Sequence, residues 1–237
     1  MYTERPEGLT VGVIGAMASE IDALKAAVEE PETMTISGVE YVSGRMGNVN
    51  VIVAKCGIGK VFAAMCAQTM VLVFGPDLVL NIGVGGSLTP GLNIADVGIA
   101  NAVVQHDMDT TAFGDPLGMV SGINVVEFPC DGETVAALEQ SARDLGVHTE
   151  KGVIASGDCF VSDDARKKHI SENIHAIVCE MEGGAIGHVC YVNQIPFCIL
   201  RAVSDNGDES AGRDFANALE RASDVALEVT RKFLASF

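Results

Sequence analysis

The stretch TVGVIGAMASEIDALKAAVEE, residues 10–30, sets the pattern of the whole chain, because a short apolar run ending in glycine is followed by an amphipathic segment. The run at 10–15 predicts a buried β-strand, and the spacing of apolar residues over 19–30 predicts a helix. The same alternation returns with a strand predicted at 48–55 and a helix at 61–75. Strands that alternate with helices favour an α/β fold, in which helices cover a parallel or mixed sheet.

The rest of the chain continues this alternation without a linker or an internal repeat, so we expect one domain over residues 1–237. Further strands are expected at 77–83, 96–107, 152–158, 176–182 and 197–205, and further helices at 133–146, 183–194 and 214–237.

The composition argues against several classes of partner. The 237 residues carry a formal net charge of -17, which repels phosphate backbones and anionic lipid, so we expect no nucleic acid and no membrane surface as partners. The most apolar span, Val61 to Gly86, is interrupted by polar residues, and the N-terminus has no apolar signal segment. The seven cysteines form no Cys-x-x-Cys pair and mostly lie in apolar segments, which is typical of reduced core residues in a cytoplasmic protein.

Three short motifs that could indicate a cofactor or metal do not fit their patterns. GVGGSL at 83–88 has Leu88 where a dinucleotide-binding loop needs glycine, and GIGK at 57–60 lacks the remaining residues of a phosphate loop. QHDMD contains His106, Asp107 and Asp109, but no second His or Cys cluster supports them as metal ligands. We therefore expect neither a metal nor a cofactor.

Acidic residues follow several of the predicted strands. Glu20 follows GAMAS, Glu182 ends CEME, and Asp205 ends RAVSD. Because α/β sheets bind ligands at the carboxyl ends of their strands, these carboxylates are candidates for one site. The alternative is structural, since Glu20 could open a helix and Asp205 could cap a helix or turn. Glu180, two residues before Glu182, is interpreted as a structural partner, and the sequence does not indicate what neutralises it.

Seven motifs in order resemble those of the 5'-methylthioadenosine/S-adenosylhomocysteine nucleosidases, over about residues 11–215: VGVIGAMASEID, KCGIGKVFAA, LNIGVGGSL, TAFGDPLG, GVIASGDCFV, CEMEGGAIGHVC and RAVSDNGDE. The resemblance implies a three-layer α/β/α sandwich of the nucleoside phosphorylase superfamily with a central mixed sheet. It also implies a homodimer without a cofactor that hydrolyses the N-glycosidic bond of adenine nucleosides, in nucleoside catabolism and methionine salvage.

The resemblance implies roles for the acidic residues. Glu20 matches the base that activates water, Asp205 the acid that protonates adenine N7, and Glu182 the residue that binds the ribose hydroxyls. Arg201 matches an arginine near the water and its carboxylates.

The resemblance also implies the walls of the pocket. Met17 and Met181 would lie against the ribose, Phe160 would stack on adenine, the backbone of Val161 would bind the base edge, and Phe215 would line the thioalkyl end. The other residues expected to contact substrate are Ile58, Val84, Gly85, Gly86, Glu180 and Ser204.

The chemistry explains why carboxyl groups are needed. Adenine leaves poorly as an anion, and a carboxylic acid can protonate it at neutral pH only if burial raises the pKa of that acid. The ribose gains oxocarbenium character as the bond breaks, which nearby carboxylates stabilise while a base orients water on the opposite face. By analogy with glycoside hydrolysis, we expect inversion.

Two positions depart from the family pattern. Val84 stands where the family often has serine, and Leu117 stands where an aromatic residue is commonly donated across the dimer interface. The preference among methylthioadenosine, adenosylhomocysteine, 5'-deoxyadenosine and aminodeoxyfutalosine is therefore open.

Two alternatives to hydrolysis remain. A purine nucleoside phosphorylase needs cationic side chains around phosphate, but GAMASE and GVGGSL contain none, and Arg45 is the only nearby arginine candidate. A non-catalytic nucleoside-binding protein would have no use for a water-activating base, so Glu20 argues against it.

Overall fold

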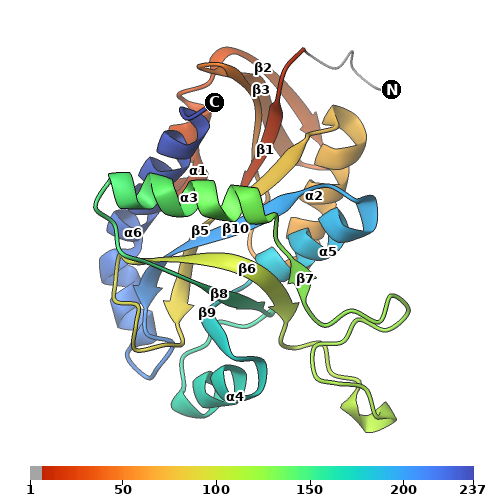
Figure 1. Ribbon diagram of the computed structural model, residues 1–237, viewed down its shortest axis with the longest axis vertical. Helices are drawn as coiled ribbons and strands as arrows, with labels where there is room; N and C mark the ends of the chain where they lie inside the picture. The colour runs from red at the N-terminus through yellow and green to blue at the C-terminus, as the bar shows by residue number, and fades with distance from the viewer. Residues whose placement is uncertain (1–6) are drawn as a thin grey trace.

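The computed structural model describes residues 7–237 and contains a mixed β-sheet between two layers of helices (Figure 1). The strands are β1 (Thr10–Gly15), β2 (Glu29–Ile36), β3 (Val39–Met46), β4 (Val49–Lys55), β5 (Leu78–Ser87), β6 (Val97–Gln105), β7 (Phe128–Pro129), β8 (Thr149–Ser156), β9 (Ala176–Glu180) and β10 (Phe197–Asp205). The helices are α1 (Ala18–Lys25), α2 (Lys60–Phe74), η1 (Thr111–Phe113), α3 (Gly132–Asp144), α4 (Asp164–Ile174), α5 (Gly183–Asn193) and α6 (Ala211–Leu234).

The sheet closes partly on itself. Its strand order is β10-β6-β8-β9-β5-β1-β4-β3-β2, and β10 also pairs with β5, so β5, β9, β8, β6 and β10 form a ring. The pairs β1–β4, β1–β5, β10–β5, β6–β8 and β8–β9 are parallel, whereas β2–β3, β3–β4, β5–β9 and β10–β6 are antiparallel. The ring brings the carboxyl ends of β5, β9 and β10 close together.

Each face of the sheet has its own apolar core. Helix α6 contributes Ala222, Ala226 and Phe233, at helical spacing, to the core shared with α1 and α3. On the other face, Ala67 of α2 and Ile186 of α5 belong to a second core. Figure 1 shows α1 with α6 on one side of the sheet and α2 with α5 on the other. The expected three-layer α/β/α sandwich with a mixed sheet is confirmed.

The first predicted helix was too long. Helix α1 ends at Lys25, and Glu29 and Glu30 already belong to β2, which pairs antiparallel with β3. Strand β2 is an edge strand whose side chains are almost all exposed, and its Pro31 is tolerated because edge strands can do without one backbone donor. A strand with no buried face gives no alternating pattern, so the sequence did not reveal it.

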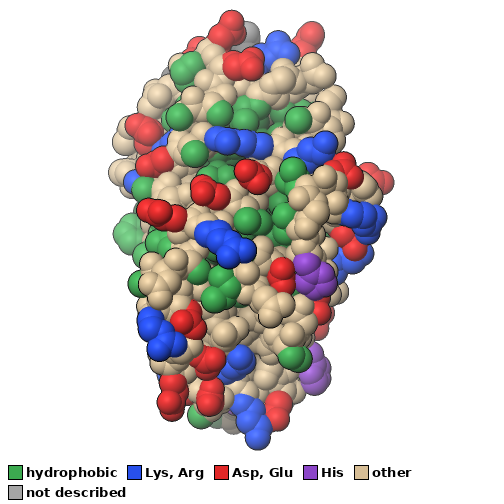
Figure 2. Space-filling view, turned by 90° about the vertical axis from the view of Figure 1, so that its left-hand side faces the viewer, with side chains coloured by type: hydrophobic (Ala, Val, Ile, Leu, Met, Phe, Trp, Pro, Cys, Tyr) green, Lys and Arg blue, Asp and Glu red, His purple; other side chains and the backbone are tan. Residues whose placement is uncertain are grey.

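The outer surface of the helical layer is mixed in character. Figure 2 shows acidic and basic side chains interspersed with apolar ones on the left-hand side of Figure 1, where α1 and α6 lie. Within residues 7–237, no helix combines the length and the apolar character needed to cross a membrane.

Candidate active site

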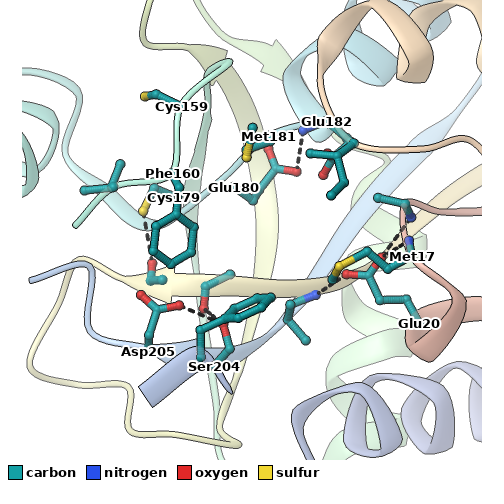
Figure 3. Close-up of a pocket in the computed structure, with 17 residues that line it drawn as sticks. Met17, Glu20, Cys159, Phe160, Cys179, Glu180, Met181, Glu182, Ser204 and Asp205 are labelled. Carbon is teal, nitrogen blue, oxygen red and sulfur yellow. Dashed lines mark hydrogen bonds between the residues drawn. The ribbon is translucent and has the colours of Figure 1, made fainter. Parts of the chain in front are cut away.

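The ends of β1, β5, β9 and β10 surround one cleft, which encloses about 610 Å³ including its open mouth (Figure 3). The cleft is lined by Ala16, Met17, Glu20, Ile58, Val84, Gly85, Gly86, Cys159, Phe160, Val161, Cys179, Glu180, Met181, Glu182, Ser204, Asp205 and Phe215.

Glu20 lies in the first turn of α1 and is held by backbone donors. Its Oε2 accepts hydrogen bonds from the N–H groups of Ala16 (2.8 Å) and Met17 (2.9 Å), and its Oε1 accepts one from Val84 (3.0 Å). Burial raises the pKa of Glu20, while Arg201 and the three backbone donors oppose that rise. The carboxylate is therefore fixed in position, and Arg201 and the three backbone donors stabilise its ionised form.

A glycine in β5 leaves room for this carboxylate. A Cβ atom at Gly83 would lie 2.4 Å from Oε1 of Glu20, so any side chain there would move the carboxylate. Further along the same strand, a Cβ atom at Gly86 would lie 2.8 Å from Oδ1 of Asp205.

Asp205 ends β10 on the other side of the cleft from Glu20, and it has different neighbours (Figure 3). The Ser204 hydroxyl donates to Oδ2 (2.8 Å), and the Gly207 N–H donates to Oδ1 (2.9 Å). Burial raises the pKa of Asp205, these two bonds lower it, and the charges of Asp208 and Asp214 raise it further. The net rise suits a carboxyl group that holds a proton.

Glu182 stands at the junction of β9 and α5. Its Oε1 accepts a hydrogen bond from the Gly59 N–H (2.8 Å), at the start of α2. Burial, followed by the charge of Glu180, raises the pKa of Glu182 to about 7. In its ionised form, the Glu182 carboxylate can accept hydrogen bonds from a neutral ligand such as a diol.

Arg201 neutralises Glu180. Its guanidinium forms an ion pair with the Glu180 carboxylate, and its Nη2 lies 3.7 Å from Oε2 of Glu182. The Ser156 hydroxyl and the N–H groups of Glu182 (3.0 Å) and Gly183 (2.8 Å) also donate to Glu180. Glu180 borders the cleft as expected, but its carboxylate is bound mainly by protein groups.

Arg201 itself lies behind the cleft wall. It is 1% exposed, it does not line the cleft, and it also donates to the Asn81 side chain. Its effect on a ligand is therefore exerted through the carboxylates in front of it. The other fourteen residues expected at the site do line the cleft.

The remaining walls are mostly apolar. Phe160 and Phe215 meet edge to face, with ring centroids 5.7 Å apart. Phe160 and Ile58 are 44% and 55% exposed, so both lie at the mouth. Met17 and Met181 line the cleft between the acidic groups (Figure 3).

Sequence reasoning missed three lining residues, Ala16, Cys159 and Cys179. Each is the immediate neighbour of an expected site residue, which was the only available signal. Leu117 lies outside the cleft of its own chain and packs against a small apolar cluster that includes Leu88 and Val104. Within the described residues, no three His, Cys, Asp or Glu side chains are grouped to hold a metal ion.

Comparison with known proteins agrees with this geometry. The family model described as "Phosphorylase superfamily" matches residues 10–235. A 5'-methylthioadenosine/S-adenosylhomocysteine nucleosidase from Shewanella pealeana is 36% identical over 216 residues, which cover 90% of this chain and 94% of that protein.

Two solved structures from Helicobacter pylori are also similar. A mutant of the nucleosidase MTAN, with 5'-methylthioadenosine in its active site, has a TM-score of 0.93 at 34% identity and covers 97% of this chain and 100% of its own. A futalosine hydrolase has a TM-score of 0.92 at 33% identity and covers 97% of this chain and 98% of its own.

Proposed function

This chain belongs to the phosphorylase superfamily and, within it, to the 5'-methylthioadenosine/S-adenosylhomocysteine nucleosidases, and we propose that it hydrolyses the N-glycosidic bond of these two nucleosides and releases adenine. The observation that carries this proposal is the charge of the cleft. Among the described residues, those that line it include four carboxylates and no Lys, Arg or His.

That charge favours water over phosphate as the nucleophile. Phosphorolysis needs cationic donors aimed at a phosphate anion. The Arg201 guanidinium behind the wall is already bound to Glu180 and lies near Glu182. Arg45, the remaining candidate from the sequence, lines a separate hollow together with residues of β2 and β4. A phosphate in the cleft would be repelled, whereas a neutral nucleoside and water would not.

Asp205 is assigned to the leaving group. Protonation of adenine at N7 lets the base depart as a neutral molecule, and burial raises the pKa of Asp205 so that it can carry that proton. The Ser204 hydroxyl and the Gly207 N–H hold the carboxyl group and stabilise the carboxylate that forms after transfer.

Glu20 and Glu182 are assigned to the sugar. Three backbone donors fix the Glu20 carboxylate, which can then accept a proton from water as it attacks C1'. Glu182 would accept hydrogen bonds from the ribose hydroxyls, and its negative charge would stabilise the developing oxocarbenium ion. Because Asp205 and Glu20 lie at opposite ends of the cleft, we expect inversion at C1' (Figure 3).

The apolar walls favour a small 5' substituent. Met17, Ile58 and Phe215 offer contact to a methylthio group, and the open mouth beside Ile58 leaves room for the longer homocysteine chain. We therefore expect methylthioadenosine to be the better of the two substrates.

The direct test is chromatography of the base released from methylthioadenosine, adenosylhomocysteine, 5'-deoxyadenosine, aminodeoxyfutalosine and adenosine, with and without phosphate. We expect adenine and free sugar from the thio-nucleosides at a rate independent of phosphate. A sugar 1-phosphate that forms only with phosphate would indicate a phosphorylase. No release of base from any nucleoside, with retained binding, would indicate a non-catalytic binding protein.

We further propose a homodimer. Helix α2 presents an apolar surface, defined here as Val61, Phe62, Met65 and Leu72, and each of these side chains is at least 44% exposed. Such a surface commonly marks an interface, and Ile58 continues it to the mouth of the cleft. A second copy bound there would border the substrate.

Sedimentation tests the dimer. The wild type should sediment at twice the chain mass of 24.7 kDa, and Phe62→Asp should sediment as a monomer. Leu145→Asp, which alters an equally apolar but unrelated exposed position at the end of α3, is the control and should remain dimeric. A monomeric wild type would contradict the proposal.

A cytoplasmic location is proposed from the cysteines. All seven are free thiols and five of them are buried, which suits a reducing compartment.

A further inference from the structure

A polar cluster joins three loops just outside the cleft. Lys60 begins α2, Asp107 follows β6, and Asp158 follows β8, and none of the three lines the cleft. The Lys60 Nζ lies 2.6 Å from Oδ1 of Asp107 and 3.2 Å from the side-chain oxygen of Gln105.

The backbone completes this cluster. The Lys60 N–H donates to Oδ1 of Asp158 (2.8 Å), and the Asp158 N–H donates to Oδ2 of Asp107 (2.9 Å). Asp107 thus binds both of the other residues through different oxygens. Partial burial opposes its ionisation, but its bonds to Lys60 and Asp158 outweigh burial and leave the pKa of Asp107 below its ordinary value.

The start of α2 connects the cluster to both halves of the cleft. The Gly59 N–H binds Glu182, and the next N–H along the chain, that of Lys60, binds Asp158. Backbone N–H groups at a helix N-terminus favour anions, so one helix end holds two carboxylates from separate loops. Asp158 lies directly before the segment that carries Phe160 and Val161.

We propose that Lys60, Asp107 and Asp158 are positioning residues that hold the base-binding segment 158–161 and the sugar-binding Glu182 at a fixed separation. This inference rests on the proposed function, which assigns the adenine and the ribose to these groups. We call the three residues the α2 latch.

The latch should affect binding more than chemistry or stability. Its ion pair is partly exposed, with side-chain exposures of 17% for Lys60 and 31% for Asp107, and such pairs contribute little to global stability. Asp205 and Glu20 make no contact with it through the hydrogen bonds described above. Loss of the latch would loosen mainly the hydrogen bonds to the base and the ribose hydroxyls, which ground state and transition state share, so KM should rise more than kcat falls.

The test compares Asp107→Asn and Lys60→Met with Lys25→Met, a matched control. Lys25 is similarly buried, at 13% exposure, and its Nζ lies 3.1 Å from a Glu40 carboxylate oxygen. We expect either latch variant to raise KM for methylthioadenosine about 10-fold, with kcat lowered less than about threefold. Lys25→Met should keep the wild-type KM, and Lys60→Arg, which retains the cation, should recover most of it.

The double variant sharpens the test. If Lys60 and Asp107 act as one unit, Lys60→Met combined with Asp107→Asn should raise KM no further than the larger single effect. An unchanged KM in both single variants would overturn the latch, as would a fall in kcat at constant KM or an equal rise of KM in Lys25→Met. A latch variant could also dissociate into monomers. If its KM returned to the wild-type value once the variant was restored to the wild-type mass, the latch proposal would likewise be overturned.

An inactive wild type would contradict the proposed function and leave the latch to be decided by binding. Calorimetric titration with adenine should then give about 10-fold weaker binding to Asp107→Asn than to the wild type, and equal affinities would overturn the latch.

Discussion

The two ends of the cleft contain the same kind of side chain in opposite electrostatic surroundings. At the sugar end, Glu20, Glu180 and Glu182 lie around the single guanidinium of Arg201. At the base end, Asp205 has no ion-pair partner among the described residues and is held by a hydroxyl and one backbone N–H. Arg201 opposes the rise in pKa that burial causes at Glu20 and Glu182, whereas no cation opposes that rise at Asp205.

This difference explains how one acid–base reaction can proceed without a histidine in the cleft. Burial raises the pKa of both Glu20 and Asp205. Arg201 and three backbone donors oppose the rise at Glu20. At Asp205 only the Gly207 N–H and the Ser204 hydroxyl oppose it, and neighbouring acidic residues add to it. Environment rather than residue type therefore separates the base from the acid.

Replacement of the proposed acid, Asp205, should have the largest effect and would abolish the difference between the two ends of the cleft. Asp205→Asn should lower kcat about 1,000-fold or more, because an amide cannot protonate adenine N7. Binding of methylthioadenosine, measured by calorimetry, should persist because Asn keeps the size and one acceptor oxygen. Near-normal turnover by this variant would remove the assignment of Asp205.

Removal of the base should have the next largest effect. Glu20→Ala should lower kcat about 100-fold or more, because no ionised carboxylate remains to accept a proton from water. The variant should stay folded, as judged by circular dichroism and the thermal midpoint, since α1 is held mainly by its apolar face. Retained hydrolysis would show that another group activates water.

Removal of the carboxylate paired with Arg201 should have a moderate effect on stability and activity. Glu180→Gln removes the main ion-pair partner of Arg201 and should lower the free energy of unfolding in urea by about 1–3 kcal/mol. We expect kcat/KM to fall about 10-fold because Arg201 would no longer be fixed beneath the sugar end. Glu139→Gln, which breaks the exposed pair with Lys151, is the control and should have a much smaller effect on stability. Equal losses of unfolding free energy in the two variants would contradict a special structural role for the pair of Glu180 and Arg201.

The smallest effect concerns pH and stability. Glu182 has its pKa raised from the ordinary 4.5 to about 7, so the folded protein binds more protons than the unfolded chain between these two values. The stability of the wild type relative to Glu182→Gln should therefore fall as pH rises from about 4.5 to about 7. Urea midpoints at several pH values measure this difference, and a difference that rises or stays constant would contradict the assignment.

The sequence predicted the location of the acids better than their partners. Glu20, Glu182 and Asp205 follow predicted strands, and the structure brings all three into one cleft. The carboxyl ends of β5, β9 and β10 meet in the ring, and β1, which precedes Glu20, pairs in parallel with β5. The expectation of nucleosidase kinship is confirmed by the comparisons. The pairing of Arg201 with Glu180 was not predictable, since it depends on the register of β9 and β10 on either side of β5.

Local sequence patterns did not predict the exposed strand β2 or the contacts between residues far apart in the sequence. Strand β2 was mistaken in part for helix because its exposed residues carry no period. The link from Lys60 to Asp107 and Asp158 spans 47 and 98 positions, and short polar motifs at each place gave no sign that they meet. Only the folded sheet brings such positions together.

The glycines of β5 restrict how this protein can be re-engineered. A methyl group at Gly83 would meet the far end of the flexible Glu20 side chain, which can move, so an alanine variant would fold and yet lose the placement of its base. At Gly86 a Cβ atom would lie 2.8 Å from Oδ1 of Asp205 and 3.2 Å from Sγ of Cys179, so the shorter acidic side chain and a buried thiol would both have to shift. Variant libraries that seek new substrates should therefore keep Gly83 and Gly86 and vary the apolar lining residues Ile58, Phe160 and Phe215. A screen for folded protein would not detect the loss of activity caused by a change at Gly83.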